Sequence, residues 1–350
     1  MKFKNYPYII AEIGANHNGD IDLAKKLIDK AKEAGCDAVK LQLLKREDVW
    51  TNDHLKELDA GIVKLKHVGK WETKELGLNS IFDQVESFYM PHEGHIELFR
   101  YASDEGIDFG STVHVKESVD FLINQHVRFI KVASPDLTNL DLIEYIISKD
   151  YPVMISTGLA SIGEIEAVTN LIPKQCKHNV SLLHCVSIYP ADYDSLNLKF
   201  IDTLKELFGF NVGYSDHALG ISSVLGAICF GANIIEKHFT LNRQMPGWDH
   251  CISSDPKEMK IICEESKKVF KAMGKSIKDI SQEELENRFK FRKSVVVNKD
   301  LTKNNIIKKE DIIFKRPGTG IRADQFKYII GRKINKDIKK DTTLYWDDIE

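Results

Sequence analysis

The sequence predicts an α/β protein, a (β/α)8 TIM barrel followed by a small domain of short strands. Short β-rich runs alternate with helical patterns over roughly the first 270 residues, and eight such runs can be counted. Eight strand-helix units in a segment of that length are typical of a closed parallel barrel. A doubly wound sheet is the alternative, but it rarely needs eight units. Past residue 280 the pattern changes to short β-branched runs joined by lysine-rich turns.

The predicted strands are runs of β-branched and other apolar residues. They are 8–14, 38–42, 108–113, 128–134, 153–157, 181–187, 212–217 and 234–240. Helical spacing follows, for example in 23–35, 119–125, 141–150, 162–172, 200–208 and 256–274. Residues 218–235 carry no charge, but glycines interrupt them, which favours a buried helix and a strand over a membrane span.

These patterns divide the chain into a barrel over 1–275, a linker over 276–292 and a C-terminal domain over 293–350. A long insertion, roughly 43–91, follows the second strand and is rich in charged and aromatic residues. Loops at this end of a barrel shape active sites, so we expect a lid or specificity element there. A passive surface excursion is the alternative.

Composition narrows the class of protein. Apolar residues make up 43% of the 350, charged residues 29%, and the formal net charge is -3. Such a balance gives no reason to expect nucleic acid or an anionic membrane as a partner. Six cysteines without a CxxC pair are typical of reduced thiols, and no secretory signal is apparent, so we expect a cytoplasmic protein. Neither GxGxxG nor GxxxxGK occurs, so no nucleotide cofactor is indicated.

Polar residues gather at the C-terminal ends of the predicted strands, where barrel enzymes place their active sites. They are Glu12, Asn16, His17, Lys40, Gln42, Ser111, Thr112, Lys131, Ser134, Asp136, Ser156, Thr157, His184, Ser187, Tyr189, Ser215, His217, Glu236 and His238. Burying so many polar groups without partners costs roughly 1 to 3 kcal/mol each. We therefore expect them to converge on an active site.

Two neighbouring strands end in a histidine, His217 and His238. The ends of adjacent parallel strands lie about 5 Å apart, so both imidazoles can bind the same ion. Two nitrogen ligands without a thiolate suit a catalytic divalent ion such as manganese, cobalt or zinc. Hydrogen-bonded core histidines are the alternative.

Lys40 and Lys131 lie inside otherwise apolar strands, and a lysine there is costly without an anion to meet it. The hydroxyls expected around them make a pocket for phosphate and carboxylate. These hydroxyls belong to Thr112, Ser134, Ser156 and Ser215. A Schiff-base lysine, and hence a metal-free aldolase, is the rival interpretation.

Several motifs resemble those of the sialic acid synthase family, the nonulosonate synthases. They are "IAEIGANHNGD", "AVKLQ", "STGLAS", "LLHCVSIYP", "GYSDHALG", "IEKHFTL" and "KRPGTGI". The resemblance covers nearly the whole chain. It implies a barrel joined to a C-terminal domain of β-clip fold, similar to type III antifreeze protein (the SAF domain). It also implies condensation of phosphoenolpyruvate with N-acetylmannosamine or a related acylamino sugar, with release of phosphate.

The resemblance also implies roles for individual residues. Those expected to hold phosphoenolpyruvate are Lys40, Thr112, Lys131, Ser134, Ser156, Ser187 and Ser215. Those expected to contact the sugar are Gln42, Tyr189, Asp249 and Arg316, the last from the partner chain of a domain-swapped homodimer. Glu12, Asp136 and Glu236 supply the catalytic carboxylates, and His217 and His238 bind manganese.

Departures from the family pattern fall mainly on the sugar side. Where members specific for N-acetylmannosamine read "SGECNN", this chain reads "ASPDLTN", so Asp136 replaces a glutamate. Ser187 replaces an asparagine, and "PGWD" replaces "PGPD". The acceptor therefore stays open between N-acetylmannosamine and the diacetamido trideoxy sugars that lead to legionaminic or pseudaminic acid. A barrel metal hydrolase and a non-catalytic carbohydrate-binding protein are more distant alternatives.

Overall fold

The computed structural model describes residues 7–60, 83 and 86–350. The chain divides into two compact units, Met1–Gly274 and Lys275–Glu350. Residues 61–82 and 84–85, about half of the insertion predicted to act as a lid, lie outside the described residues. Its described parts include two short helices, α2 (Arg46–Val49) and α3 (Asn52–Asp59).

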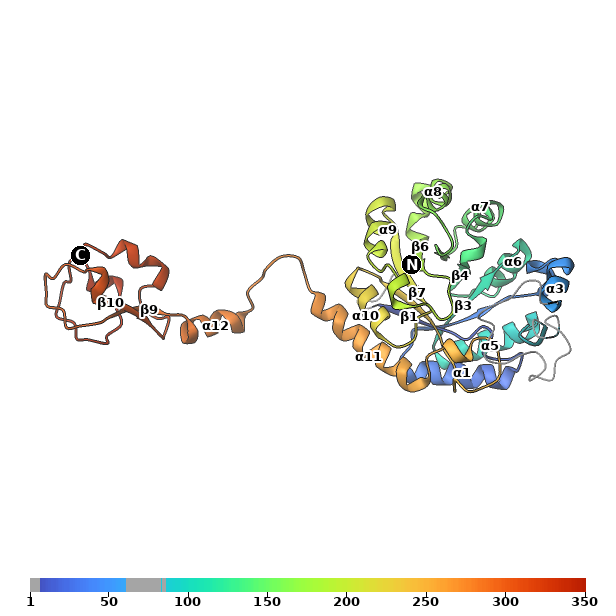
Figure 1. Ribbon diagram of the computed structural model, residues 1–350, viewed down its shortest axis with the longest axis horizontal. Coiled ribbons are helices and arrows are strands. Elements are labelled where there is room, and N and C mark those ends of the chain that lie inside the picture. The colour runs from blue at the N-terminus through green and yellow to red at the C-terminus, as the bar shows by residue number, and fades with distance from the viewer. Residues whose placement is uncertain (1–6, 61–82, 84–85) are drawn as a thin grey trace. The chain divides into compact units, whose positions relative to one another are not determined.

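The first unit is a closed barrel of eight parallel strands, as the sequence predicts (Figure 1). Each strand pairs with the next, and β1 closes the barrel by pairing with β8. The strands are β1 (Tyr8–Glu12), β2 (Ala38–Gln42), β3 (Asp108–Val113), β4 (Phe129–Val132), β5 (Val153–Ser156), β6 (Val180–Cys185), β7 (Asn211–Asp216) and β8 (Ile234–His238).

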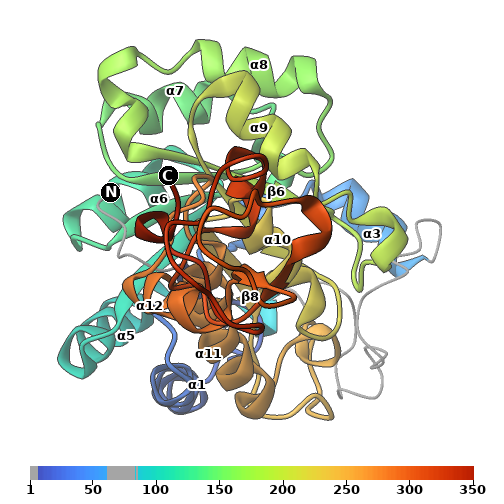
Figure 2. The ribbon, with the colours of Figure 1, turned by 90° about the vertical axis from the view of Figure 1, so that its left-hand side faces the viewer.

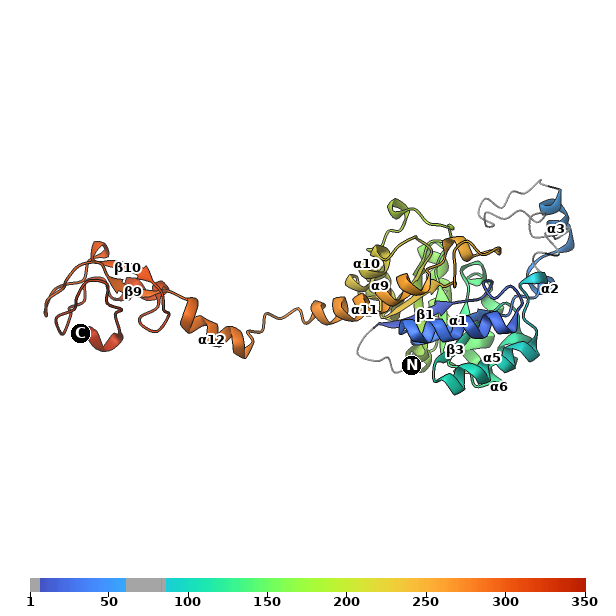
Figure 3. The same ribbon diagram turned by 90° about the horizontal axis from the view of Figure 1, so that it is seen from below.

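Helices surround the strands on the outside of the barrel (Figure 3). They are α1 (Ile21–Ala34), α5 (His92–Glu105), α6 (Lys116–Asn124), α7 (Leu140–Ser148), α8 (Ile162–Asn170), α9 (Phe200–Phe208), α10 (Ser222–Cys229) and α11 (Pro256–Met273). Local sequence sets their ends. In α1 the Asp20 carboxylate accepts hydrogen bonds from the backbone N–H groups of Asp22 and Leu23, and Gly35 ends the helix at a φ of 93°. Among the described residues, no helix combines the length and apolar character needed to cross a membrane.

The barrel interior has an apolar layer, and two residues further along the same strands it becomes polar. The apolar layer includes Ile10, Ala38, Phe129, Met154, Leu183 and Ile234. The residues two positions later are Glu12, Lys40, Lys131, Ser156, Cys185 and Glu236. Side chains of a strand alternate between its faces, so each strand that fills the core also presents a polar group at the C-terminal mouth.

The second unit begins with a segment containing helix α12 (Gln282–Phe291) and continues into a loop-rich domain (Figure 2). Strands β9 (Ser294–Val297) and β10 (Ile312–Lys315) form an antiparallel pair. Several short 3-10 turns and isolated bridges complete the domain. Its own core is aliphatic and includes Val295, Val297, Ile307, Ile321 and Leu344.

Candidate active site

The C-terminal mouth of the barrel encloses a cavity of about 620 Å³. Most of the predicted site residues line it. They are Glu12, Lys40, Gln42, Thr112, Lys131, Ser134, Asp136, Ser156, Tyr189, Ser215, His217, Glu236, His238 and Asp249. Asp48, Val49 and Trp50 of the insertion after β2 line it as well. That insertion therefore helps to shape the mouth through its first described helix.

Two lysines and two glutamates form a buried charge network in this cavity. Lys40 pairs with Glu12 and donates a hydrogen bond to Thr112 Oγ1 at 2.8 Å. Lys131 Nζ lies 3.0 Å from Glu236 Oε1, which also accepts a hydrogen bond from Ser215 Oγ at 2.9 Å. Each of the four charged side chains is at most 7% exposed. Internal carboxylates thus pair with both lysines and hold them in place.

The two glutamates differ in their proton affinity. Burial raises the pKa of Glu12, an effect that its neighbour Lys40 only partly offsets. Burial also disfavours the charge on Glu236, but Lys131 and Lys40 outweigh it and lower the pKa of Glu236 to about 2. Glu236 is therefore a fixed anion, whereas Glu12 is better suited to exchange a proton.

Asp249 is the third carboxyl group of the mouth. Burial, reinforced by the charge of Glu12, raises its pKa to about 7. Its Oδ2 lies 3.5 Å from Nδ1 of His238. Asp249 and its neighbour Trp248 reach the cavity from the segment that follows β8, and Trp248 packs edge-to-face on Phe88 at 5.2 Å between ring centroids.

His217 and His238 face each other with ring centroids 5.4 Å apart. Nδ1 of His217 donates to the backbone carbonyl of Val186 at 2.8 Å, so Nε2 carries the lone pair whenever the ring is neutral. Burial disfavours the charged ring, but Cys185 and the bond to Val186 outweigh it and raise the pKa of His217. Burial, together with the nearby His217 and Lys40, holds the pKa of His238 well below its usual range. His238 is therefore neutral, which is the form of imidazole that binds metals.

These two rings fit a divalent metal that has open coordination positions. No group of three or more histidine, cysteine, aspartate or glutamate side chains suited to holding a metal occurs among the described residues. Nδ1 of His238 is buried and has no hydrogen-bond partner among the residues that the structure describes. The donor set of two imidazoles suits a catalytic ion that completes its shell with water or substrate.

Ser134 and Ser187 lie at one corner, next to Gly158. Gly158 N donates to Ser134 Oγ at 3.1 Å. A Cβ at Gly158 would lie 2.5 Å from Ser187 Oγ and 2.6 Å from Ser134 Oγ, so only glycine fits between the two hydroxyls. Ser134 lines the main cavity, whereas Ser187 is not one of its lining residues.

Several other polar strand ends do not reach the mouth, contrary to the expectation that all would converge. His184 Nε2 hydrogen-bonds the carbonyl of Leu196 at 2.7 Å, and His184 and Thr157 line a separate cavity of about 830 Å³. Asn16 binds Phe239 O and Ser253 Oγ. The cavity lining likewise excludes Ser111 and His17. Alternation along each strand sends neighbouring residues to opposite faces.

His114, Cys185 and Trp248 are among the residues of the mouth that the sequence analysis did not predict. His114 follows Thr112 by two positions, and Cys185 follows Leu183 by two, so period-two spacing from an inward-facing residue places both on the cavity side. Nδ1 of His114 lies 2.7 Å from Oδ2 of Asp136.

Arg316 belongs to the second unit. Its side chain is exposed there, and Nε donates to the carbonyl of Phe291 at 3.0 Å. Its guanidinium lies 5.3 Å from the centroid of the Phe291 ring. Its predicted contact with the sugar in a partner chain therefore stays a prediction.

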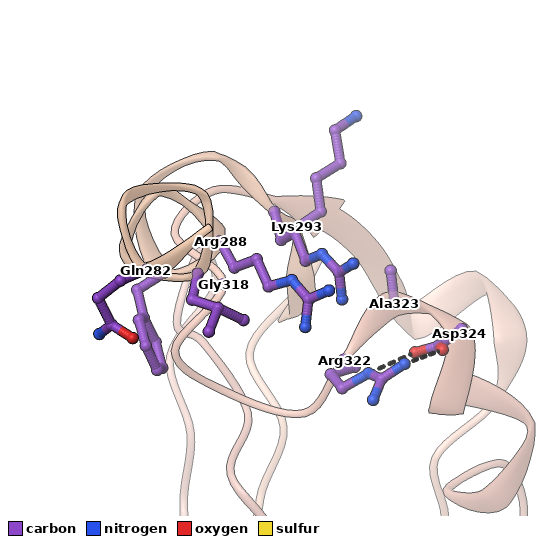
Figure 4. Close-up of a pocket in the computed structure, with 10 residues that line it drawn as sticks. Gln282, Arg288, Lys293, Gly318, Arg322, Ala323 and Asp324 are labelled. Atoms are coloured by element: carbon purple, nitrogen blue, oxygen red, sulfur yellow. Dashed lines mark hydrogen bonds and ion pairs between the residues drawn. The ribbon is translucent and has the colours of Figure 1, made fainter. Parts of the chain in front are cut away.

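A further cavity, of about 730 Å³, lies wholly within the second unit (Figure 4). Arg288 and Arg322 point into it, while Lys293 extends away from it. Arg322 pairs with Asp324 through bonds of 3.0 Å and 2.5 Å. Apart from Gln282 and the carboxylate of Asp324, the lining of this cavity is cationic and apolar, and it contains none of the predicted site residues.

Comparison with known families decides the classification. The NeuB family model matches residues 27–278, and the SAF domain model matches residues 292–350. The chain belongs to the NeuB family. Its barrel carries the NeuB match and its loop-rich domain the SAF match, in agreement with the resemblance drawn from the motifs.

Relatives of this NeuB-family chain are named synthases of nonulosonic acids. An N,N'-diacetyllegionaminic acid synthase of Legionella pneumophila is 37% identical over 98% of this chain and 94% of its own length. A pseudaminic acid synthase of Campylobacter jejuni is 32% identical over 95% of this chain and 93% of its own. The crystal structure of an N-acetylneuraminic acid (sialic acid) synthetase from Leptospira borgpetersenii, in complex with citrate, has a TM-score of 0.70. It is 32% identical and covers 82% of this chain and 92% of its own.

Proposed function

We propose that this protein condenses phosphoenolpyruvate with an open-chain acylamino sugar and water, giving a nine-carbon 2-keto acid and phosphate. The observation that carries the proposal is the mouth of the barrel, where two buried lysines and several hydroxyls face a pair of histidines. Membership of the NeuB family, with its named synthases, supports the same reaction.

The donor occupies the lysine side of the mouth. Lys40 and Lys131 offer ammonium groups to its phosphate and carboxylate, and nearby hydroxyls offer further hydrogen bonds. These hydroxyls belong to Thr112, Ser134, Ser156 and Ser215. Ser187, beside Gly158, remains a candidate for the edge of this subsite. To bind, the donor must draw each lysine partly away from its glutamate.

The reacting end of the acceptor occupies the histidine side, with Gln42, Tyr189 and Asp249 as its polar contacts. Tyr189 packs against His217 with ring centroids 4.1 Å apart and keeps that ring in place. A divalent ion, which we propose to be manganese held by His217 and His238, would polarise the sugar aldehyde when bound.

The carboxylates act on the donor carbon after the carbon-carbon bond forms. The methylene carbon of phosphoenolpyruvate attacks the aldehyde carbon, and positive charge develops on the carbon that carries the phosphate. Glu236, fixed as an anion by Lys131, stabilises this charge. Glu12 accepts a proton from the water that adds to the same carbon. The carbon-oxygen bond to phosphate then breaks as the added hydroxyl gives its proton to the departing phosphate, which leaves the keto group. The proton held by Glu12 passes to the oxygen of the former aldehyde.

The acceptor is N-acetylmannosamine or a 2,4-diacetamido trideoxy hexose, the latter making the enzyme a legionaminic or pseudaminic acid synthase. The relatives support the second candidate as strongly as the first, because both a legionaminic and a pseudaminic acid synthase match almost the full chain. Asp136, where a glutamate is expected for N-acetylmannosamine, favours the diacetamido sugars.

The experiment that tests the function is phosphate release from phosphoenolpyruvate by the purified protein with manganese. The two classes of acceptor are compared in parallel, and a chelator is then added. We expect release with one class and its loss on chelation. Failure to release phosphate with either class would overturn the reaction, and release that survives chelation would overturn the metal.

We also propose a homodimer in which Arg316 acts in the barrel of the partner. Its exposed guanidinium supports this. Mixing His238→Ala chains with Arg316→Ala chains tests the arrangement, because a mixed dimer then contains one complete site if Arg316 acts in trans. Activity restored on mixing supports the proposal, whereas two variants that stay inactive together contradict it.

A further inference from the structure

His114 and Asp136 form a hydrogen-bonded dyad in the wall of the mouth. His114 directly follows β3, and Asp136 is held by a 3-10 turn, Ser134–Asp136, that follows β4. Nδ1 of His114 lies 2.7 Å from Oδ2 of Asp136, with the two side chains 9% and 18% exposed. A carboxylate oxygen only accepts, so the hydrogen of this bond belongs to Nδ1.

The second ring nitrogen of His114 has no protein partner. Nε2 is buried and makes no hydrogen bond to any part of the chain that the structure describes. Because Asp136 fixes the hydrogen on Nδ1, a neutral ring keeps a lone pair on Nε2. A buried acceptor without a partner is unfavourable, so a ligand that donates a hydrogen bond there binds more tightly.

The dyad lies across the mouth from the histidine pair. In the closed order of strands, β3 and β4 are four places from β7 and β8, which carry or precede His217 and His238. A group that meets His114 is therefore remote from the reacting aldehyde. The charge of Asp136 disfavours the phosphate or carboxylate of the donor at this point. What fits is a neutral N–H or O–H group of the acceptor.

We propose that His114, oriented by Asp136, is a specificity-determining residue whose Nε2 accepts a hydrogen bond from an acylamino N–H or a hydroxyl of the acceptor sugar. The proposal rests on the function proposed above and adds to it a residue that binds the part of the acceptor remote from the aldehyde. It also explains why an aspartate can stand where a glutamate is expected, because the shorter carboxylate acts through an imidazole.

Two substitutions of His114 distinguish binding of the sugar by Nε2 from positioning of Asp136 by Nδ1. In His114→Asn the side-chain amide takes the place of Nδ1 and can still donate to Asp136, but nothing replaces Nε2. In His114→Phe both interactions are lost. If Nε2 binds the sugar, both variants raise the KM for the acceptor by about 10- to 100-fold, while the KM for phosphoenolpyruvate stays within about twofold. If His114 only holds Asp136, the asparagine variant behaves like the wild type.

Calorimetric titration of the acceptor sugars into wild type and His114→Asn, with manganese present, gives a readout that needs no turnover. Weaker sugar binding by the variant supports the proposal, and equal binding overturns it while leaving the proposed function intact. If the wild-type protein neither binds nor turns over any acylamino sugar, the proposed function fails and this inference fails with it.

Discussion

Lys237 Nζ lies 2.5 Å from Oδ2 of Asp216, and this buried ion pair joins β7 to β8 beside His217 and His238. The carboxylate of Asp216 also accepts hydrogen bonds from Ser223 Oγ and Tyr214 OH, while Lys237 donates a second bond to the carbonyl of Ala218. Each charged residue precedes a histidine by one position. Asp216 and Lys237 alternate with residues that face the cavity, so the pair fixes the two strand ends from the outer face of the barrel.

Replacing Lys237 by methionine tests this relationship. The substitution leaves Asp216 buried without its counter-charge, so we expect the free energy of unfolding to fall by roughly 3 to 5 kcal/mol. We also expect manganese binding to weaken by about tenfold or more, because the support of the ligands is lost. Electron paramagnetic resonance of free manganese measures that affinity. Lys116→Met, which breaks an exposed pair with Asp141, is the control. An unchanged affinity in a folded Lys237→Met protein would confine the pair to a structural role.

Lys131→Met removes one of the two lysines proposed to hold the donor. We expect phosphoenolpyruvate to bind about 10- to 100-fold more weakly, the usual effect of losing a charge-assisted hydrogen bond. We also expect the variant to be less stable, because the more distant Lys40, at 3.9 Å, is then the positive charge nearest to the Glu236 carboxylate. In Lys131→Met/Glu236→Gln the stability should recover while donor binding does not. Calorimetry and urea denaturation measure the two effects, and recovery of donor binding in the double variant would contradict the role of Lys131.

Gly158→Ala tests the corner between Ser134 and Ser187. The added methyl group forces at least one hydroxyl to rotate, so we expect weaker binding of phosphoenolpyruvate in a protein that still folds. The matched control is Gly163→Ala in α8, where an added Cβ meets no atom within 4 Å. That control should bind the donor normally and gain up to about 1 kcal/mol of stability. Equal donor affinity in the two variants would remove this corner from the site.

We expect the free energy of unfolding to fall in acid because of two buried histidines. Burial lowers the pKa of His17 to about 3 and that of His95 to about 4, below the ordinary value of 6.5. In the unfolded chain both rings take up protons as the pH falls through 6.5, but in the folded chain they stay neutral. Stability is therefore complete above pH 6.5 and falls below it, by about 1.4 kcal/mol per pH unit for each ring, until the folded pKa is reached.

Urea denaturation at pH 7, 6 and 5 measures this dependence on pH. His95→Gln, which cannot ionise, should show a shallower loss of stability, whereas the exposed His178→Gln should lose stability as the wild type does. If His95→Gln lost stability as steeply as the wild type, the His95 ring would be charged or hydrated in the fold.

The barrel could be predicted from the sequence because each strand is a short run rich in apolar and β-branched residues between turn signals. Its ends were placed up to two residues too far, as in 234–240 against Ile234–His238, since the loops at the mouth continue with the same kinds of residue. The antiparallel pair of the second unit, by contrast, depends on long-range pairing that no local pattern specifies.

The kinds of residue in the site could be predicted from the sequence, but the direction in which each side chain points was harder to predict. The run "LLHCVS" contains polar residues on both faces, and only the burial of Leu183 in the interior shows that Cys185 faces the cavity and His184 does not. His114 was missed because the strand was expected to end at Val113. Asp249 and Trp248 reach the mouth from an irregular segment, whose path the spacing of residues does not define.

The charge network of the mouth affects how the protein behaves before it meets a substrate. Lys40 and Lys131 are already neutralised by Glu12 and Glu236, so these four side chains together carry no net charge. The ligand-free barrel therefore already supplies a counter-charge to each lysine without a bound anion. An arriving anion competes with carboxylates built into the protein, and this competition favours ligands that engage both lysines at once over simple inorganic anions in the surrounding solution.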